Sequence, residues 1–442
     1  MKRYQFASII IEVILLLLFV DSLKALPRFA LKGGEAWCGG CHLNPTGGGM
    51  RTKGGDEFAM KRLPMWDRGP KFSADISEGL RLGVDLRSQF LYFSEHTVGV
   101  QTLTDSLSHT TTTSIDKKAS MNGLLEMAMP IYISATLSPA IQAYARFDPV
   151  TNGAWEVYGL VHFIHPSGDI WEAGSVLSDA YLKIGAFLPT FGIRFDDHTV
   201  YTRGGTYTLS GYSPAGMFWE PNYKDEGAEL GISLFDYHAF ITADILNGNE
   251  MNPLQPFKLD PMGPYAVSLR AEVTGSLIDS VVSAEIGGSA YLHDNTHLPN
   301  QSAPSGLADT SLMTTLIAVH GGIRAGPVRI LAEVDFGKNI FHPLTHAFTA
   351  KANALAIETA FDLLQGLAGI FRFDNYKDQD ETVNLTEVKH RVMFGLQWFP
   401  VRFLEFRPEV RLATVTAPNP DAPSERLDHT ETTALLQTHI YF

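Results

Sequence analysis

From residue 79 onward, hydrophobic and polar side chains alternate along the chain with a period of two residues. A period of two is the spacing of a β-strand, whose successive side chains point to opposite faces, whereas a helix repeats every 3.6 residues. The alternation is clearest in three stretches, whose apolar faces are Leu80, Leu82, Val84, Leu86, Phe90 and Tyr92, then Val328, Ile330, Ala332, Val334 and Phe336, and then Leu404, Phe406, Val410 and Leu412. Charged residues occupy the opposite face of each stretch, so the pattern predicts an all-β fold of amphipathic strands.

About sixteen strands are predicted, and the connections between them alternate in length. The predicted strands are 79–94, 121–134, 137–148, 153–164, 178–189, 226–236, 238–248, 263–275, 279–293, 311–325, 327–338, 347–362, 366–376, 387–399, 401–416 and 432–442. Short turns are expected at 235–238, 325–327 and 399–401, and long loops at 95–120, 190–225, 294–310 and 417–431. One connection, 165–177, is too long for this scheme.

Two architectures share this alternation. A soluble sandwich would expose the charged faces and pair the apolar ones, whereas a membrane barrel turns the apolar faces to lipid and the polar faces to its lumen. Repetition without a helical interlude and loops of alternating length favour the barrel, in which closure leaves no unpaired edge. The terminal Tyr441 and Phe442 resemble the C-terminal assembly signal of bacterial outer-membrane proteins. We therefore expect residues 76–442 to form a transmembrane antiparallel β-barrel of about 16 strands, with outer-membrane lipid around it.

The first 25 residues read as an export signal. Lys2 and Arg3 provide the positive start, residues 9–20 form an apolar run, and Ala25 is a small residue at a plausible cleavage point. An uncleaved N-terminal anchor is the alternative interpretation.

Composition adds two constraints. The formal net charge of −14 argues against a nucleic-acid partner, because such partners require a positive surface. The chain contains only two cysteines, whereas an exported protein stabilised by disulfides would carry more. The two cysteines therefore indicate local chemistry.

Those cysteines belong to the sequence Cys38-Gly39-Gly40-Cys41-His42, a C-x-x-C-H motif. Two thiols at this spacing can bond covalently to one haem, and the following histidine can bind its iron, so we predict one covalent haem c with His42 as proximal ligand. A redox C-x-x-C would be followed by a thioredoxin-like unit, and a zinc site needs more nearby ligands. Neither is found here, while a plain disulfide loop remains possible.

The haem segment, assigned to residues 26–75, is too short to enclose a haem by itself, so another part of the chain should provide a wall. A methionine that follows the motif is expected to be the distal ligand, in the order Met60, Met65, Met50. If none of them binds the iron, His96 or His162 is the alternative.

The arrangement resembles the fused monohaem cytochrome–porins, a family that includes outer-membrane iron oxidases. The resemblance covers the architecture of the whole mature chain, and it lies in residues 27–30 leading into Cys38, Cys41 and His42, followed by a Gly-rich segment with Phe58. Residues 44–51 depart from the iron-oxidase pattern, which indicates a sister group. The resemblance implies electron transfer across the bacterial outer membrane, with a periplasmic c-type cytochrome as one partner.

A haem segment entering from the periplasmic side would plug the lumen, and the long loops 95–120, 190–225, 377–386 and 417–431 would then lie outside. One haem is shorter than the apolar band of the membrane, so the outer partner should be a small donor or acceptor such as Fe(II). Acidic residues and histidines in three predicted loops offer weak cation ligands, although solvated polar loops are the favoured interpretation. These residues are Asp196, Asp197 and His198, then Asp378, Asp380 and Glu381, and then Asp428, His429 and Glu431.

Three functions remain open from the sequence. The first is an electron conduit that passes electrons between an extracellular partner and a periplasmic cytochrome. The second is a diffusion porin whose haem segment is a structural or redox-sensing plug. The third is an enzyme acting on a small molecule at an open haem site.

Overall fold

The structure is a computed structural model. It describes residues 24–25, 35–36, 38–69, 73–104, 110–150, 154–164, 176–195, 199–208, 211–214, 217, 224–248, 266–278, 281–294, 313–342, 347–380, 385–419 and 422–442. No helix among these residues is both long enough and apolar enough to cross a membrane. The expected export signal falls almost entirely outside them.

The described residues form one short helical turn, one α-helix and many strands. The turn is η1 (Cys38–Gly40) and the helix is α3 (Lys53–Lys61). The strands are β1 (Lys24–Ala25), β2 (Glu35–Ala36), β3 (Asp75–Ser77), β4 (Leu80–Thr104), β5 (Thr110–Ala128), β6 (Ile131–Ser138), β7 (Ile141–Asp148), β8 (Ala154–Ile164), β9 (Leu177–Phe187), β10 (Gly205–Thr208), β11 (Gly211–Pro214), β12 (Asp225–Leu234), β13 (Ala239–Leu246), β14 (Ala266–Ile278), β15 (Val282–Asp294), β16 (Met313–Ala325), β17 (Val328–His342), β18 (Ala347–Leu364), β19 (Leu367–Asp380), β20 (Leu385–Trp398), β21 (Leu404–Asn419) and β22 (Ala422–Tyr441).

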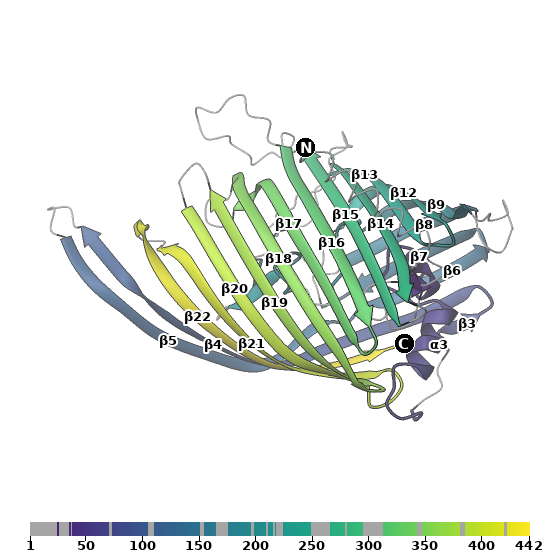
Figure 1. Cartoon of the computed structure of the whole chain (residues 1–442), viewed down its shortest axis with the longest axis horizontal. Coiled ribbons are helices and arrows are strands. Elements are labelled where there is room, and N and C mark those ends of the chain that lie inside the picture. The colour runs from purple at the N-terminus through teal and green to yellow at the C-terminus, as the bar shows by residue number, and fades with distance from the viewer. Residues whose placement is uncertain are drawn as a thin grey trace.

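Strands β3 to β9 and β12 to β22 close into an antiparallel barrel (Figure 1), whereas β1–β2 and β10–β11 form two separate two-stranded sheets. β5 and β6 both pair with β4 and form a single staggered strand that is interrupted at Pro130, where the missing amide hydrogen breaks the ladder. With the short β3 counted as an extension, the described barrel has 16 strands, as the sequence predicted. The last strand, β22, pairs with β4, and the amide of Phe442 donates to the carbonyl of Val84 at 3.0 Å.

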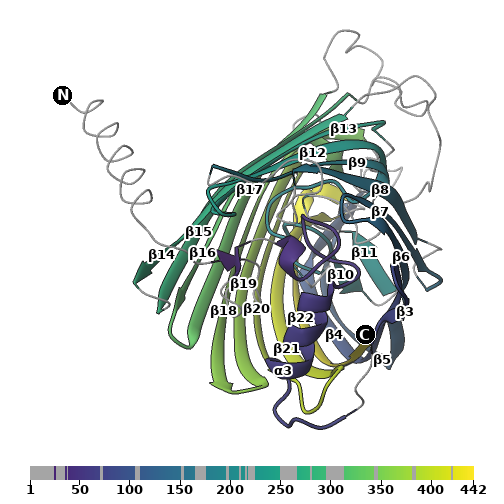
Figure 2. The same ribbon diagram turned by 90° about the vertical axis from the view of Figure 1, so that its right-hand side faces the viewer.

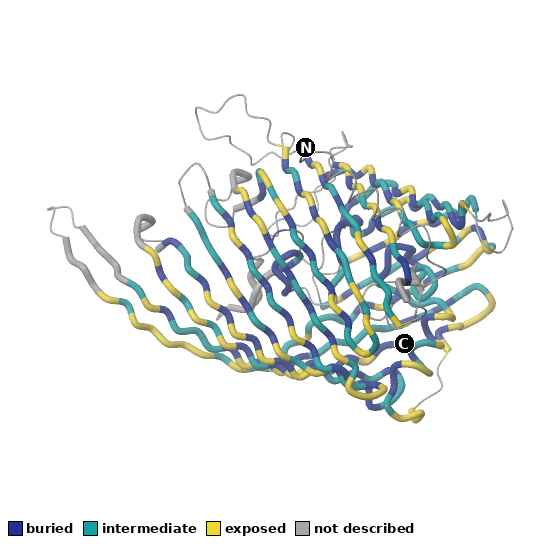
Figure 3. Tube along the Cα trace, viewed as in Figure 1, coloured by how far each residue is buried: buried dark blue, intermediate teal, exposed yellow. Residues whose placement is uncertain are grey.

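Buried and exposed residues alternate along the barrel strands, as a membrane barrel requires (Figure 3). On β9, Ile184 is 57% exposed, whereas its neighbour Lys183 has no exposed surface. Elsewhere on the barrel, Val319 of β16 is 52% exposed and Glu333 of β17 is fully buried. The outer surface is therefore apolar and the inner surface is charged, which reverses the arrangement of a soluble sandwich.

Three predicted loops are instead strands. β4 continues to Thr104 and β5 begins at Thr110, within the predicted loop 95–120, and β21 and β22 likewise cover most of 417–431. β19 and β20 leave only residues 381–384 of the predicted loop 377–386 between them. The boundaries were wrong because backbone pairing continues beyond the apolar band, where both strand faces are polar and the alternation disappears.

The connection 165–177 is genuine, since β8 and β9 are antiparallel neighbours. Strand order places it at the same end as the short turns. Most of its residues lie outside the described part of the chain.

Candidate functional site

Residues 38–69, here called the inserted segment, lie in the barrel mouth at the short-turn end (Figure 2). The amide of Met65 donates to the carbonyl of Phe399 at 2.7 Å, and the amide of Trp66 donates to Pro400 at 3.1 Å. The side-chain amide of Gln365 donates to the carbonyl of Pro64 at 2.9 Å. Backbone contacts with two short turns thus fix the end of the segment to the rim.

The C-x-x-C-H motif forms a tight turn. The amides of Cys41 and His42 donate to the carbonyl of Cys38 at 3.1 and 2.8 Å, which brings both thiols and the imidazole onto one turn. Thr52 caps α3 by accepting from the Gly55 amide, and its hydroxyl also donates to the Gly40 carbonyl at 2.7 Å. The helix N-terminus therefore supports the motif directly.

Gly47 allows the chain to fold back over the motif. Its φ of +90° is a conformation that side chains strongly disfavour, and a Cβ there would lie 3.2 Å from the Sγ of Cys38. The Gly-rich stretch thus packs closely against the first thiol, which gives a physical reason for glycine at this position.

Charged wall residues hold the inserted segment inside the barrel. Lys183 contacts Glu229 at 2.7 Å and donates to the side-chain oxygen of Asn44 at 3.4 Å, and all three residues are buried. Arg81 of β4 forms an ion pair with Asp56 of α3. Burial raises the pKa of Asp56, and the positive charge of Arg81 opposes that rise.

Charged side chains of the barrel wall affect the pKa of the Cys38 thiol. The pKa of its thiol is raised to about 12, chiefly by burial; Glu272 and Glu285 contribute to the rise, and Arg270 and Arg194 oppose it. A thiol with such a high pKa stays protonated near neutral pH, whereas a redox-active cysteine or a zinc ligand works as the thiolate.

The described residues also fit a bound group beside Cys38. Both cysteines lie on one turn with His42. On the facing wall, Nε of Arg270, Oε2 of Glu285 and Nδ1 of His320 are buried and have no hydrogen-bond partner among the described residues. Buried polar atoms usually have partners, so these three suit a lumen that receives a further polar group such as a haem.

The candidate methionines lie in different surroundings. Met50 packs into a buried cluster with lumen tyrosines such as Tyr144 and Tyr158. Met60 packs against Phe399 and Phe403 near the rim, in a separate cluster. These contacts do not select a methionine as iron ligand, so the order Met60, Met65, Met50 stays a prediction.

A second element also enters the lumen. The prediction that residues 190–225 form an outer loop was wrong in part, because the described residues between Thr190 and Arg203 fold into the lumen. We call residues 188–204 the inner loop. Ile193, Val200 and Tyr201 are buried. An apolar group inside a surface loop is the sequence signal that could have revealed this.

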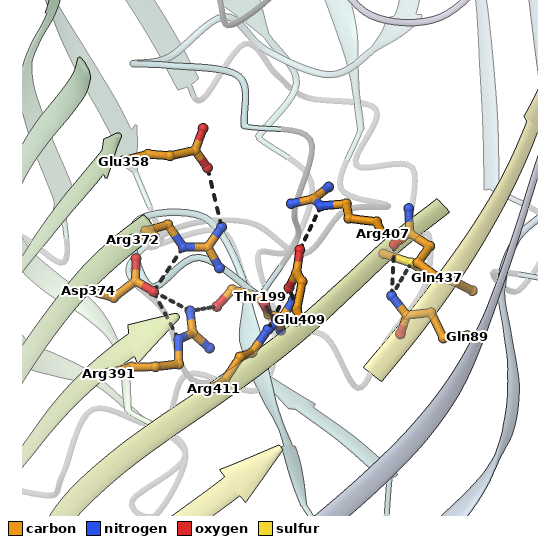
Figure 4. Close-up of polar contacts among 11 residues, drawn as sticks. Gln89, Thr199, Glu358, Arg372, Asp374, Arg391, Arg407, Glu409, Arg411 and Gln437 are labelled. Atoms are coloured by element: carbon orange, nitrogen blue, oxygen red, sulfur yellow. Dashed lines mark hydrogen bonds and ion pairs between the residues drawn. The ribbon is translucent and has the colours of Figure 1, made fainter. Parts of the chain in front are cut away.

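Arginines on neighbouring strands fix the inner loop (Figure 4). Arg391 of β20 donates to the carbonyl of Thr199 and contacts Asp374 at 2.7 Å. Arg411 of β21 donates to the hydroxyl of Thr199 at 2.6 Å and pairs with Glu409 at 2.6 Å. The loop therefore bridges the lumen to the β20–β21 wall.

The inner loop also contacts the inserted segment. The guanidinium of Arg194 donates to the carbonyl of Gly47. Since Gly47 packs on Cys38, the inner loop reaches a residue that contacts the C-x-x-C-H motif. Two elements that enter the lumen separately thus meet at the motif.

We expect Arg203→Ala to destabilise the barrel by about 3 kcal/mol, because it leaves two buried carboxylates without their cation. Arg203 contacts Asp335 at 2.9 Å and forms a second ion pair with Glu333, and both carboxylates have no exposed surface. Urea unfolding followed by tryptophan fluorescence measures the loss. Adding Glu333→Gln and Asp335→Asn to this variant should recover part of it, and an unchanged unfolding curve for Arg203→Ala would contradict the expectation.

The proposed cation ligands do not gather. Asp196, Asp197, His198 and Glu381 lie outside the described residues. Within the part of the chain that the structure describes, no three His, Cys, Asp or Glu side chains form a group suited to a metal ion.

Comparisons with known proteins give likeness in overall shape alone. No family model and no curated protein sequence matches the chain. Among solved structures, it is similar to OprB of Pseudomonas putida (10% identity, TM-score 0.48, 83% of this chain and 94% of that one). It is also similar to a loop-deleted OmpT of Vibrio cholerae (10%, 0.45, 82% and 99%) and to the channel DcaP of Acinetobacter baumannii (10%, 0.44, 83% and 98%). Such low scores add nothing to the strand pairing, so the fold rests on the barrel itself.

Proposed function

We propose that this chain is an outer-membrane electron-transfer protein whose inserted segment carries one covalent haem c. It exchanges electrons between a small extracellular donor or acceptor, such as Fe(II), and a periplasmic c-type cytochrome. The observation that supports this most is the position of the C-x-x-C-H turn, which lies among lumen charges instead of in a separate domain.

Residues of the chain have distinct roles in this proposal. The thiols of Cys38 and Cys41 attach the group covalently, and His42 holds the iron. When bound, a c-type haem supplies one-electron transfer between its ferrous and ferric states. Lys183 and Arg81 keep the segment in the mouth, and the inner loop covers the motif from the other end of the lumen.

Outer-membrane barrels have short turns on the periplasmic side and longer connections on the outer side, and this rule gives the orientation of the chain in the membrane. The inserted segment contacts the short turns, so it enters from the periplasmic side. A periplasmic cytochrome can then approach the rim around α3, whereas an outer partner must enter the opposite mouth. A small solute suits this path better than a solid mineral.

Electron transfer is tested with the purified protein in liposomes that enclose an oxidised cytochrome c. Externally added Fe(II) should reduce the enclosed cytochrome, and the Cys38→Ala/Cys41→Ala protein should show only the background rate. Equal rates for the two proteins, with haem intact in the first, would refute the proposal.

A diffusion porin with a haem-bearing plug is the second candidate. It is favoured by a charged lumen in a 16-strand barrel, which is wide enough for water. Ion conductance across planar bilayers distinguishes the two, because a conduit that is closed to solutes should conduct little in either haem oxidation state.

A further inference from the structure

The wall facing the C-x-x-C-H turn carries four charged or titratable side chains, which we call the wall cluster. It consists of Arg270 and Glu272 on β14, Glu285 on β15 and His320 on β16. These three strands are consecutive neighbours in the barrel. All four side chains are largely buried, and they face the lumen.

The imidazole of His320 has two different environments at its two nitrogens. Its Nε2 lies 3.4 Å from the carboxylate of Glu272, and the side chain has no exposed surface. Its Nδ1 is buried and has no hydrogen-bond partner among the described residues. A carboxylate at one ring nitrogen holds the proton there and leaves the lone pair of the other nitrogen for a metal.

The neighbouring strand makes room for this ring. A Cβ at Gly287 of β15 would fall 2.4 Å from Nε2 and 2.7 Å from Cε1 of His320. Any larger residue at position 287 would displace the imidazole. The ring is thus positioned by Glu272 on one strand and by a glycine on the next.

The inner loop connects the wall cluster to the motif. Its Gly192 amide donates to the hydroxyl of Ser289 at 2.8 Å, and Ser289 of β15 pairs with Arg270 of β14 in the strand register. Its Arg194 donates to the carbonyl of Gly47, which packs against Cys38. Glu272 contacts both Arg270 and His320. His320 therefore belongs to the wall of the lumen region in which a group bonded to Cys38 would lie.

We infer that His320 is the second axial ligand of the haem iron, with His42 as the first. This inference rests on the covalent haem of the proposed function. Met60, the distal ligand expected from the sequence, instead packs among aromatic side chains at the β20–β21 turn. A bis-histidine haem has a lower potential than a His/Met haem, so the assignment bears on which partners can donate electrons.

Three variants test the assignment: His320→Leu, His320→Met and the control His293→Leu. His293 is also a buried lumen histidine, on β15 near its outer end, where Nε2 lies 3.0 Å from the Gly248 carbonyl. Mass spectrometry first establishes that each protein carries one haem. Absence of haem from the unmodified protein would refute the proposed function, and no ligand would then remain to be assigned.

With haem attached, the unmodified protein should show a six-coordinate low-spin spectrum without the near-infrared band of a methionine ligand. His320→Leu should become five-coordinate and bind carbon monoxide, and His320→Met should gain the methionine band and a higher midpoint potential. His293→Leu should match the unmodified protein in all of these measurements.

A methionine band in the spectrum of the unmodified protein would overturn the assignment of His320 as the ligand. This measurement needs no variant, so it remains decisive even if His320→Leu folds poorly. An unchanged spectrum in a folded His320→Leu protein would also overturn it. A spectral change in Met60→Leu instead would assign the ligand to Met60. None of these spectral outcomes decides whether the protein transfers electrons, because the liposome experiment measures electron transfer separately.

Discussion

The Cys38→Ala/Cys41→Ala protein is expected to carry no covalent haem, whereas the unmodified protein carries one. Attachment needs both thiols, and the chain has no other cysteine that could replace them. Denaturing electrophoresis with haem staining and intact-mass measurement give the result directly. Export and maturation must take place in a host that attaches c-type haem.

The barrel should nevertheless fold in this variant. Its strands are held by strand pairings that run from β4 to β22 and close back on β4, and neither cysteine belongs to these strands. Heat-dependent mobility in electrophoresis and the β signal in circular dichroism are the controls. A single Ala variant that keeps a covalent haem would indicate one thioether bond, and retention of haem by the double variant would refute the assignment of the motif.

The features of the fold that could be predicted from the sequence are those set by the surroundings of each strand by itself. The alternation of residues such as Leu80 and Arg81 is set by two environments, lipid and lumen, so it can be read from the sequence without any partner strand. The strand number and the short turns followed from it. Strand ends were predicted less well, because the outer part of β5 is almost entirely polar on both faces, and its pairing with β4 depends on backbone hydrogen bonds that the sequence pattern does not show.

The interior of the lumen was predicted poorly, and the reason is sequence separation. The inner loop is held by Thr199 against Arg391 and Arg411, and the periodicity of one strand cannot reveal such contacts. His320 was on a predicted strand, but its proximity to Glu272 and Cys38 depends on the closure of the whole barrel. The motif itself was visible, because two thiols and a histidine act as neighbours in the sequence.

The contacts between the inserted segment and the wall also explain how the C-x-x-C-H motif can be held in this chain without a domain of its own. A segment of this size cannot bury enough apolar surface to enclose a haem. Here the barrel provides the second wall, with charged contacts such as Lys183 to Asn44 and packing such as Arg51, whose guanidinium lies 4.3 Å from the centre of the Tyr441 ring. The segment and barrel should therefore be regarded as one folding unit.

Deleting residues 38–69 is expected to raise the single-channel conductance at least several-fold. The deletion removes the segment that fills the short-turn mouth, while the strand ladder that closes the barrel stays intact. A 16-strand barrel without a plug encloses an aqueous channel. Planar-bilayer recording at fixed salt measures the change, after heat-dependent mobility has shown that the shortened protein folds.

The haem-free Cys38→Ala/Cys41→Ala protein is the matched control, because it keeps the segment and lacks only the attachment. Its conductance should stay close to that of the unmodified protein, since Lys183, Arg81 and the rim turns still hold the segment in place. A large rise in this control would mean that the haem, and not the segment, closes the lumen. An unchanged conductance in the deletion protein would show that the inner loop, held by Arg391 and Arg411, seals the barrel alone and that the inserted segment serves only the haem.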